Sequence, residues 1–248
     1  MIEATNLSFS IGDKAILTDV SIEIPYGEVL SILGPNGAGK TSLLKCLTGA
    51  EKPIAGDVLL DGQPLQHYPP SQLAKRRAVL SQSIEVSFPF TVEEIVLMGR
   101  NPHIQHSETK YDKEIASYIL DMLEATHLAD RLYSTLSGGE KQRVQFARIL
   151  TQIWDQENAC LFLDEPTAAL DLKHQISILE IAKELASSRG FAICAILHDL
   201  KLAKIFSDKL ILMKSGKVFV KYDHSDALKV EDICALMDVP ETYTRQLI

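Results

Sequence analysis

Short runs of apolar residues alternate along the chain with longer segments in which apolar residues recur at helical spacing. Three of the short runs are apolar at every position except Ser31: residues 29–33, 160–163 and 191–197. Nearly continuous apolar runs of this length favour strands that are buried on both faces, as in parallel sheets covered by helices. Helical patterns follow Lys40, Lys173 and Asp199. We therefore expect an α/β core with a mostly parallel sheet.

The strand pattern differs towards the two ends of the chain. Residues 2–9 and 20–24 favour an antiparallel pair. Residues 208–213 and 217–220 favour a hairpin with its turn at residues 215–216. The expected architecture is therefore mixed.

Between about residues 82 and 154 the strand pattern disappears. From Lys113 onward, Ile115, Ile119 and Leu123 recur at helical spacing. We expect a single domain, 1–248, into which a helical subdomain is inserted. Its predicted parts are a catalytic core with an antiparallel β subdomain, 1–82 and 155–248, and a helical subdomain, 83–154. Pro69-Pro70 favours a turn rather than a domain boundary.

Composition limits the classes of function. The 248 residues carry a net charge of -8, so no general basic surface favours nucleic acid as a partner. Apolar runs fall well short of the ~20 residues that span a bilayer, and the first residues lack the pattern of a secretory signal. The four cysteines form no close-spaced pair, which favours buried thiols in a reducing cytosol: Cys46, Cys160, Cys194 and Cys234.

Residues 34–41 form a glycine-rich loop, Gly-Pro-Asn-Gly-Ala-Gly-Lys-Thr, between a predicted strand and a predicted helix. This context favours a phosphate loop over a simple glycine turn. Its glycines let backbone N–H groups converge on phosphate oxygens at the positive end of a helix. Lys40 adds a full charge near the β and γ phosphates, and the Thr41 hydroxyl is a ligand for Mg²⁺. The predicted nucleotide contacts here are Asn36, Gly37, Ala38, Gly39, Lys40, Thr41 and Ser42.

Asp164 and Glu165 follow the apolar run at residues 160–163. Alone, such a pair is often a solvated strand exit. In a protein with a phosphate loop, Asp164 is placed to hold Mg²⁺, and Glu165 to polarise the water that attacks the γ phosphate.

A second glycine motif, Leu-Ser-Gly-Gly-Glu, occupies residues 136–140. Ser137 and Glu140 fit a helix capping box. That box does not explain Gly138-Gly139, because each glycine costs a helix roughly 1 kcal/mol relative to alanine. A second phosphate-binding helix N-terminus would explain them, since bare backbone allows an anion to approach closely.

In order and spacing, these motifs resemble those of ABC transporter ATPases over essentially the whole chain. The resemblance implies an α/β fold: a P-loop NTPase (RecA-like) core with a mixed sheet, an N-terminal antiparallel β subdomain and an inserted α-helical signature subdomain. It also implies a head-to-tail homodimer. Each ATP would lie between the phosphate loop of one copy and Ser137, Gly138 and Gly139 of the other.

The resemblance assigns three further residues. Gln82 matches the glutamine that contacts Mg²⁺ and faces the membrane partner, Asp171 matches the D-loop aspartate, and His198 matches the histidine that contacts the γ phosphate. Without the resemblance, a histidine after an apolar strand is usually structural. His103 and His106 have a spacing that suits a metal, but their polar surroundings favour a solvated loop.

The sequence departs from the family pattern at two positions. Glu140 stands where the signature motif usually ends in glutamine, which adds negative charge near a bound triphosphate. Ile11 aligns with the aromatic residue that normally stacks on adenine, with Phe9 as a weaker candidate. Selectivity for ATP over GTP is therefore less firmly predicted than phosphate binding.

Residues 87–103 resemble the corresponding segment of importers for iron chelates and cobalamin, and within that group haem importer ATPases. From the residues themselves, Thr91 is an N-cap with Glu94 completing its box, which a plain core helix also satisfies. The resemblance implies an ATP-hydrolysing motor subunit for haem import, peripheral at the cytoplasmic face of the cell membrane. Its partners would be integral membrane permease subunits and, indirectly, a periplasmic or surface substrate-binding protein.

Other functions remain open at this point. They are the ATPase of a related iron-siderophore or cobalamin importer, a soluble ABC ATPase acting on DNA or ribosomes, and a module that binds ATP without useful turnover.

Overall fold

A computed structural model describes residues 1–81, 88–168, 170–242 and 244. The strands are β1 (Ile2–Ile11), β2 (Lys14–Ile24), β3 (Val29–Leu33), β4 (Ala55–Leu60), β5 (Gln63–Pro64), β6 (Arg77–Leu80), β7 (Cys160–Asp164), β8 (Ala192–Ile196), β9 (Lys209–Lys214) and β10 (Lys217–Tyr222). The helices are α1 (Lys40–Leu47), α2 (Pro70–Arg76), α3 (Val92–Leu97), α4 (Lys110–Met122), α5 (Gly138–Ile153), α6 (Leu172–Arg189), α7 (Leu200–Phe206) and α8 (Val230–Met237).

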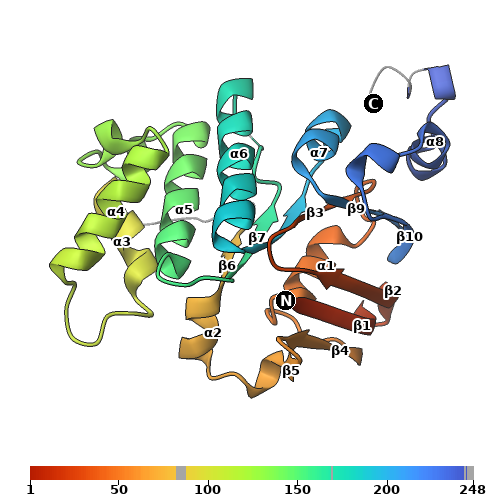
Figure 1. Cartoon of the computed structure of the whole chain (residues 1–248), viewed down its shortest axis with the longest axis horizontal. Helices are drawn as coiled ribbons and strands as arrows, with labels where there is room; N and C mark the ends of the chain where they lie inside the picture. Colours follow the sequence, from red (N-terminus) through yellow and green to blue (C-terminus); the bar gives the residue numbers. More distant parts are fainter. Residues whose placement is uncertain (82–87, 169, 243, 245–248) are drawn as a thin grey trace.

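Within the described residues the strands form two sheets (Figure 1). The order β2-β1-β4-β5 is antiparallel throughout. The order β10-β9-β3-β8-β7-β6 is parallel except for β10, which pairs antiparallel with β9. The prediction of a mixed α/β fold is confirmed.

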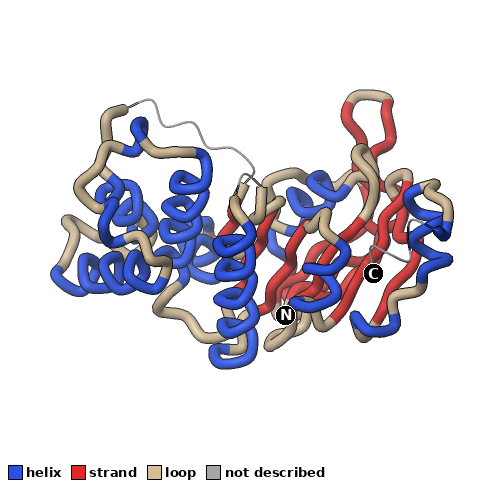
Figure 2. The backbone as a smooth tube through the Cα atoms, turned by 90° about the horizontal axis from the view of Figure 1, so that it is seen from above, coloured by secondary structure: helices blue, strands red, loops and turns tan. Residues whose placement is uncertain are grey.

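The central sheet is buried on both faces, as its apolar strands predict. On β7, Leu161 and Leu163 face a core shared with α5 and α6, whereas Cys160 and Phe162 face a second core shared with α1 and the antiparallel sheet. The helices α3, α4 and α5 gather at one end of the molecule, away from the antiparallel sheet (Figure 2).

The apolar runs locate the buried strands well, and the predicted hairpin has its turn at Ser215 and Gly216, both with positive φ (49° and 75°). Pro69-Pro70 is a correction: it begins helix α2 rather than forming a turn, since proline is tolerated in a first helical turn. Three of the four cysteines are buried free thiols, and Cys234 is half-buried.

His103 is a second correction. Its side chain is 12% exposed, with Nε2 lying 2.8 Å from the Gln152 carbonyl oxygen and Nδ1 lying 3.3 Å from an Asp155 carboxylate oxygen. The histidine therefore anchors its loop to α5, whereas His106 is exposed as predicted.

Candidate functional site

Three strands of the parallel sheet deliver the predicted residues to one edge. The glycine-rich loop follows β3, Asp164 ends β7, and His198 comes two residues after β8. Because β3, β8 and β7 are parallel neighbours, their carboxyl ends lie side by side. Ligands of open α/β sheets bind at this edge.

The loop between β3 and α1 is tightly packed. Gly39 caps α1 with a left-handed backbone (φ 96°), and a Cβ there would lie 2.9 Å from the Leu17 side chain. At Gly34 a Cβ would lie 2.3 Å from the Met213 carbonyl oxygen. Only glycine satisfies the loop at these positions.

A cavity of about 480 Å³ opens over this loop. Its lining residues are Lys14, Ala15, Ile16, Asn36, Gly37, Ala38, Gly39, Lys40, Thr41, Ser42, Glu165, Ser215 and Gly216. All the nucleotide contacts predicted at residues 36–42 are among them. Another cavity, of about 540 Å³, lies between Cys46 and Leu73 and includes none of the predicted residues in its lining.

The Lys40 side chain folds back over the loop. Its Nζ donates to the carbonyl oxygens of Gly34 (2.8 Å) and Pro35 (3.1 Å). Burial lowers the pKa of Lys40, and the nearby carboxylates of Glu165 and Asp164 partly offset this effect. A cation is thus held at the floor of the cavity, next to the start of α1.

Thr41 and Asp164 meet beneath the cavity. The Thr41 hydroxyl donates to Asp164 Oδ1 at 3.3 Å. Burial raises the pKa of Asp164, and the Glu165 carboxylate adds to the increase, while the Thr41 hydrogen bond opposes it. A hydroxyl and a carboxylate are oxygen donors of the kind that Mg²⁺ prefers.

Glu165 adopts a left-handed backbone (φ 53°) directly after β7, which turns its side chain to the cavity wall. Its Oε1 lies 2.6 Å from His198 Nε2. The His198 side chain is 47% exposed, against 21% for Glu165. A carboxylate and an imidazole therefore share one hydrogen bond at the mouth of the cavity.

Part of the cavity wall was not predicted from the sequence. Gly216 N donates to the Ala38 carbonyl at 3.0 Å, which joins the β9–β10 turn to the phosphate loop. Lys14 and Ile16 line the cavity from β2. Ile11, predicted to cover the base, is 63% exposed and is not among the lining residues. A turn signal at residues 215–216 was visible in the sequence, but its contact with the phosphate loop depends on the tertiary fold.

The second glycine motif begins α5. Ser137 caps the helix, and its box with Glu140 is complete: Glu140 N donates to Ser137 Oγ (3.3 Å) and Ser137 N donates to Glu140 Oε2 (2.7 Å). Ser137 and Gly138 are exposed. In Figure 1, α5 and α1 lie on opposite sides of α6, so one copy does not bring this motif to its own phosphate loop.

The sequence pattern of the ABC transporter family matches residues 17–168, more than half of the chain. The chain belongs to the ABC transporter family. It is an ATP-binding and ATP-hydrolysing subunit of this type, and its fold class is confirmed as that of these cassettes. No helix within the described residues combines the length and apolar character needed to cross a membrane.

Similar proteins agree with this membership. The Hemin import ATP-binding protein HmuV of Escherichia coli O157:H7 is 42% identical over 238 residues, which covers 95% of this chain and 91% of the relative. Among solved structures, an inward-facing ABC transporter described as of the metal-chelate type has a TM-score of 0.81 at 28% identity, over 96% of this chain and 89% of that one. A dimeric bacterial ABC transporter cassette has a TM-score of 0.78 at 28% identity, over 90% and 98%.

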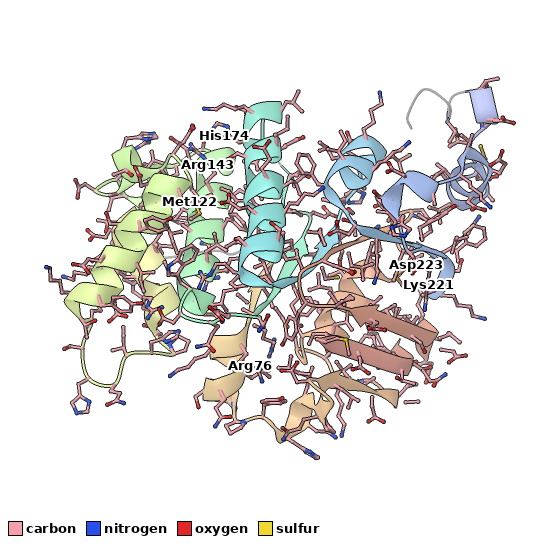
Figure 3. The ribbon with its side chains drawn as sticks, viewed as in Figure 1. Arg76, Met122, Arg143, His174, Lys221 and Asp223 are labelled. Carbon is pink, nitrogen blue, oxygen red and sulfur yellow. The ribbon has the colours of Figure 1, made fainter. Side chains whose placement is uncertain are left out.

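The predicted D-loop aspartate is not among the lining residues of the cavity. Asp171 caps α6, with Oδ1 accepting from His174 N at 3.0 Å. Its pKa is lowered by the His174 backbone and side-chain hydrogen bonds, and Arg143 on α5, labelled with His174 in Figure 3, adds positive charge. Gln82 lies outside the described residues.

Proposed function

We propose that this chain is the ATP-hydrolysing motor of an ABC importer that powers uptake of haem across the cytoplasmic membrane. The observation that supports haem as the cargo is the 42% identity, over 95% of the chain, to a relative named for hemin import. A structural neighbour described as a metal-chelate transporter supports the wider importer group. The alternative is the ATPase of a related iron-siderophore or cobalamin importer.

In the proposed reaction, the amides of residues 36–42 and the Lys40 ammonium bind the phosphates, which replace the carbonyl partners of Lys40. Glu165 orients and polarises the attacking water, and His198 holds the Glu165 carboxylate and contacts the γ phosphate. Thr41 and Asp164 are the residues that would hold Mg²⁺, with Gln82 as a further predicted ligand. Bound there, the ion would neutralise charge on the phosphates.

The proposed active form is a homodimer. The separation of the α1 and α5 N-termini within one copy supports an arrangement in which Ser137, Gly138 and Gly139 of a second copy complete each site. The related cassette is described as dimeric. ATP would then bridge two surfaces, and hydrolysis would release them.

Membrane permease subunits would convert this cycle into transport. We place the dimer as a peripheral complex at the cytoplasmic face of the membrane, with a periplasmic or surface binding protein acting through the permease.

Replacing the proposed base tests the catalytic assignment. Glu165→Gln should bind ATP within a few-fold of the parent, lower turnover by about 100-fold or more, and accumulate an ATP-dependent dimer in size-exclusion chromatography. Glu180→Gln, an exposed position on α6, is the control and should hydrolyse ATP at the parent rate. Parent-like hydrolysis by Glu165→Gln would show that another group activates the water.

The cargo is tested with the assembled transporter. The chain is co-purified with its permease, and the complex is reconstituted in liposomes. ATP hydrolysis is then measured with binding proteins loaded with haem, a ferric siderophore or cobalamin. We expect stimulation by the haem-loaded protein. Stimulation by one of the others alone would assign the chain to that importer.

A further inference from the structure

Arg131 lies beside Glu140, the residue at which this chain departs from the family's signature motif. Its Nη1 donates to Glu140 Oε1 at 3.0 Å, and its Nη2 donates to the Thr135 carbonyl at 3.3 Å. The other carboxylate oxygen of Glu140 accepts from Ser137 N. The Glu140 carboxylate is therefore held between the helix cap and a guanidinium group.

The charge of Glu140 opposes the proposed task of this helix end. An α-helix N-terminus carries roughly half a positive charge, which an acidic side chain in the first turn offsets. A triphosphate bound at this helix end would be repelled by that carboxylate. Glutamine at this position would make the same cap without the charge.

The Arg131 backbone is anchored independently of Glu140. Its carbonyl accepts from Val92 N at 3.0 Å, and its N–H donates to the Leu128 carbonyl at 2.9 Å. The guanidinium is therefore presented from the loop packed on the start of α3. A fixed fork with two acceptors makes a better counter-charge than a freely moving lysine.

We propose that Arg131 is a positioning residue for nucleotide-dependent pairing of two copies of this chain: by neutralising Glu140, it keeps Ser137, Gly138 and Gly139 receptive to the triphosphate held by the other copy. This inference rests on the proposed function, in which ATP lies between two subunits. It adds a residue that acts through Glu140 without touching the nucleotide.

A double-mutant cycle in the Glu165→Gln background tests the proposal. The ATP concentration for half-maximal dimer formation is measured by sedimentation velocity. Arg131→Met should raise this concentration about three- to tenfold, and Glu140→Gln should change it less than about twofold. The combination of Arg131→Met with Glu140→Gln should return to the value of Glu140→Gln alone.

Further variants and measurements separate charge compensation from a structural role. Lys110→Met removes a cation that pairs with Glu114 at 3.3 Å on the exposed face of α4, and should leave dimerisation unchanged. Arg131→Lys keeps the charge but loses the fork, so its defect should be smaller than that of Arg131→Met. The defect of Arg131→Met should shrink as salt rises, because exposed charges are screened. With Glu165 restored, Arg131→Met should raise KM more than it lowers kcat, with the thermal midpoint near that of the parent.

Each outcome is decisive. An Arg131→Met defect that Glu140→Gln leaves in place, or the absence of any defect, overturns the role of Arg131. Failure of the Glu165→Gln parent to dimerise with ATP overturns the two-copy site itself, and the role of Arg131 with it.

Discussion

Lys40 binds its own loop in this structure, through the carbonyl oxygens of Gly34 and Pro35. Burial lowers the pKa of Lys40, but two carboxylates, Glu165 and Asp164, stand nearby and favour the charged form. A cation so placed is ready to exchange backbone oxygens for phosphate oxygens, which carry more negative charge.

Removing this cation should greatly weaken ATP binding. Lys40→Ala is expected to weaken ATP affinity by about 100-fold or more, because the interaction with the β and γ phosphates is lost in a partly dry cavity. Lys14→Ala, on the exposed rim of the same cavity, should weaken affinity by less than about fivefold. Isothermal titration calorimetry with ATP measures both, and equal losses would contradict a special role for Lys40.

At this scale the sequence predicted the residues that belong to contiguous motifs. Lys40, Thr41 and Asp164 occupy fixed positions relative to a strand end, so local spacing is enough to find them. Arg131 and Ile16 were not predicted, since they reach Glu140 and the cavity only through tertiary contacts.

At the scale of helices and strands, an almost fully buried arginine joins α4 to the end of α5. Arg100 is 1% exposed and donates to Asp112 (2.9 Å), to Asp155 (2.5 Å) and to the Thr151 carbonyl (2.8 Å). Burial alone would raise the pKa of Asp112, but hydrogen bonds from Thr109 and Arg100 outweigh it and lower the pKa to about 2.

This shift predicts a loss of stability in acid. A carboxyl whose pKa is depressed on folding stabilises the protein above its unfolded pKa of about 3.9, and the stabilisation is lost as pH falls towards the folded value. Between pH 5 and pH 3 the unfolding free energy of the parent should therefore fall by about 1 kcal/mol more than that of Asp112→Asn. Urea unfolding at each pH gives both values, and a constant difference between them would contradict the prediction.

The elements also show where sequence patterns were insufficient. β3 and β7 are apolar at nearly every position, so both were predicted within one residue. β4 begins with the exposed residues 55–57, and β6 has only four residues, so neither gave a clear pattern. Their place is fixed by pairing with β1 and β7, which a linear pattern does not record.

Across the whole molecule, helices α3, α4 and α5 share an apolar core with the parallel sheet, and polar contacts add to it. Gln142 on α5 donates to the Pro166 carbonyl (3.3 Å), directly after Glu165, and Gln152 donates to the carbonyls of Ala74 (2.7 Å) and Arg77 (2.9 Å). The first contact joins the signature helix to the loop that carries the proposed base.

Ligand binding to the core should stabilise the whole chain. In Glu165→Gln protein, ATP at about 100 times its Kd with Mg²⁺ should add about 2.7 kcal/mol and raise the thermal midpoint by roughly 5–10 °C. Chelating Mg²⁺ with EDTA should remove part of this increase. In the same background, Asp164→Asn should show only the smaller, metal-free increase in thermal midpoint, whether or not Mg²⁺ is present. If Mg²⁺ raised the midpoint of Asp164→Asn as much as that of its parent, Asp164 would not be a ligand.

Over many generations, the left-handed backbone at Glu165 sets selection for folding against selection for turnover. Glycine or asparagine would relieve roughly 1 kcal/mol of conformational strain at this position. Selection for folding stability alone would therefore favour replacement of the acid. A lineage that keeps glutamate there accepts a permanently weaker fold as the condition of running the catalytic cycle.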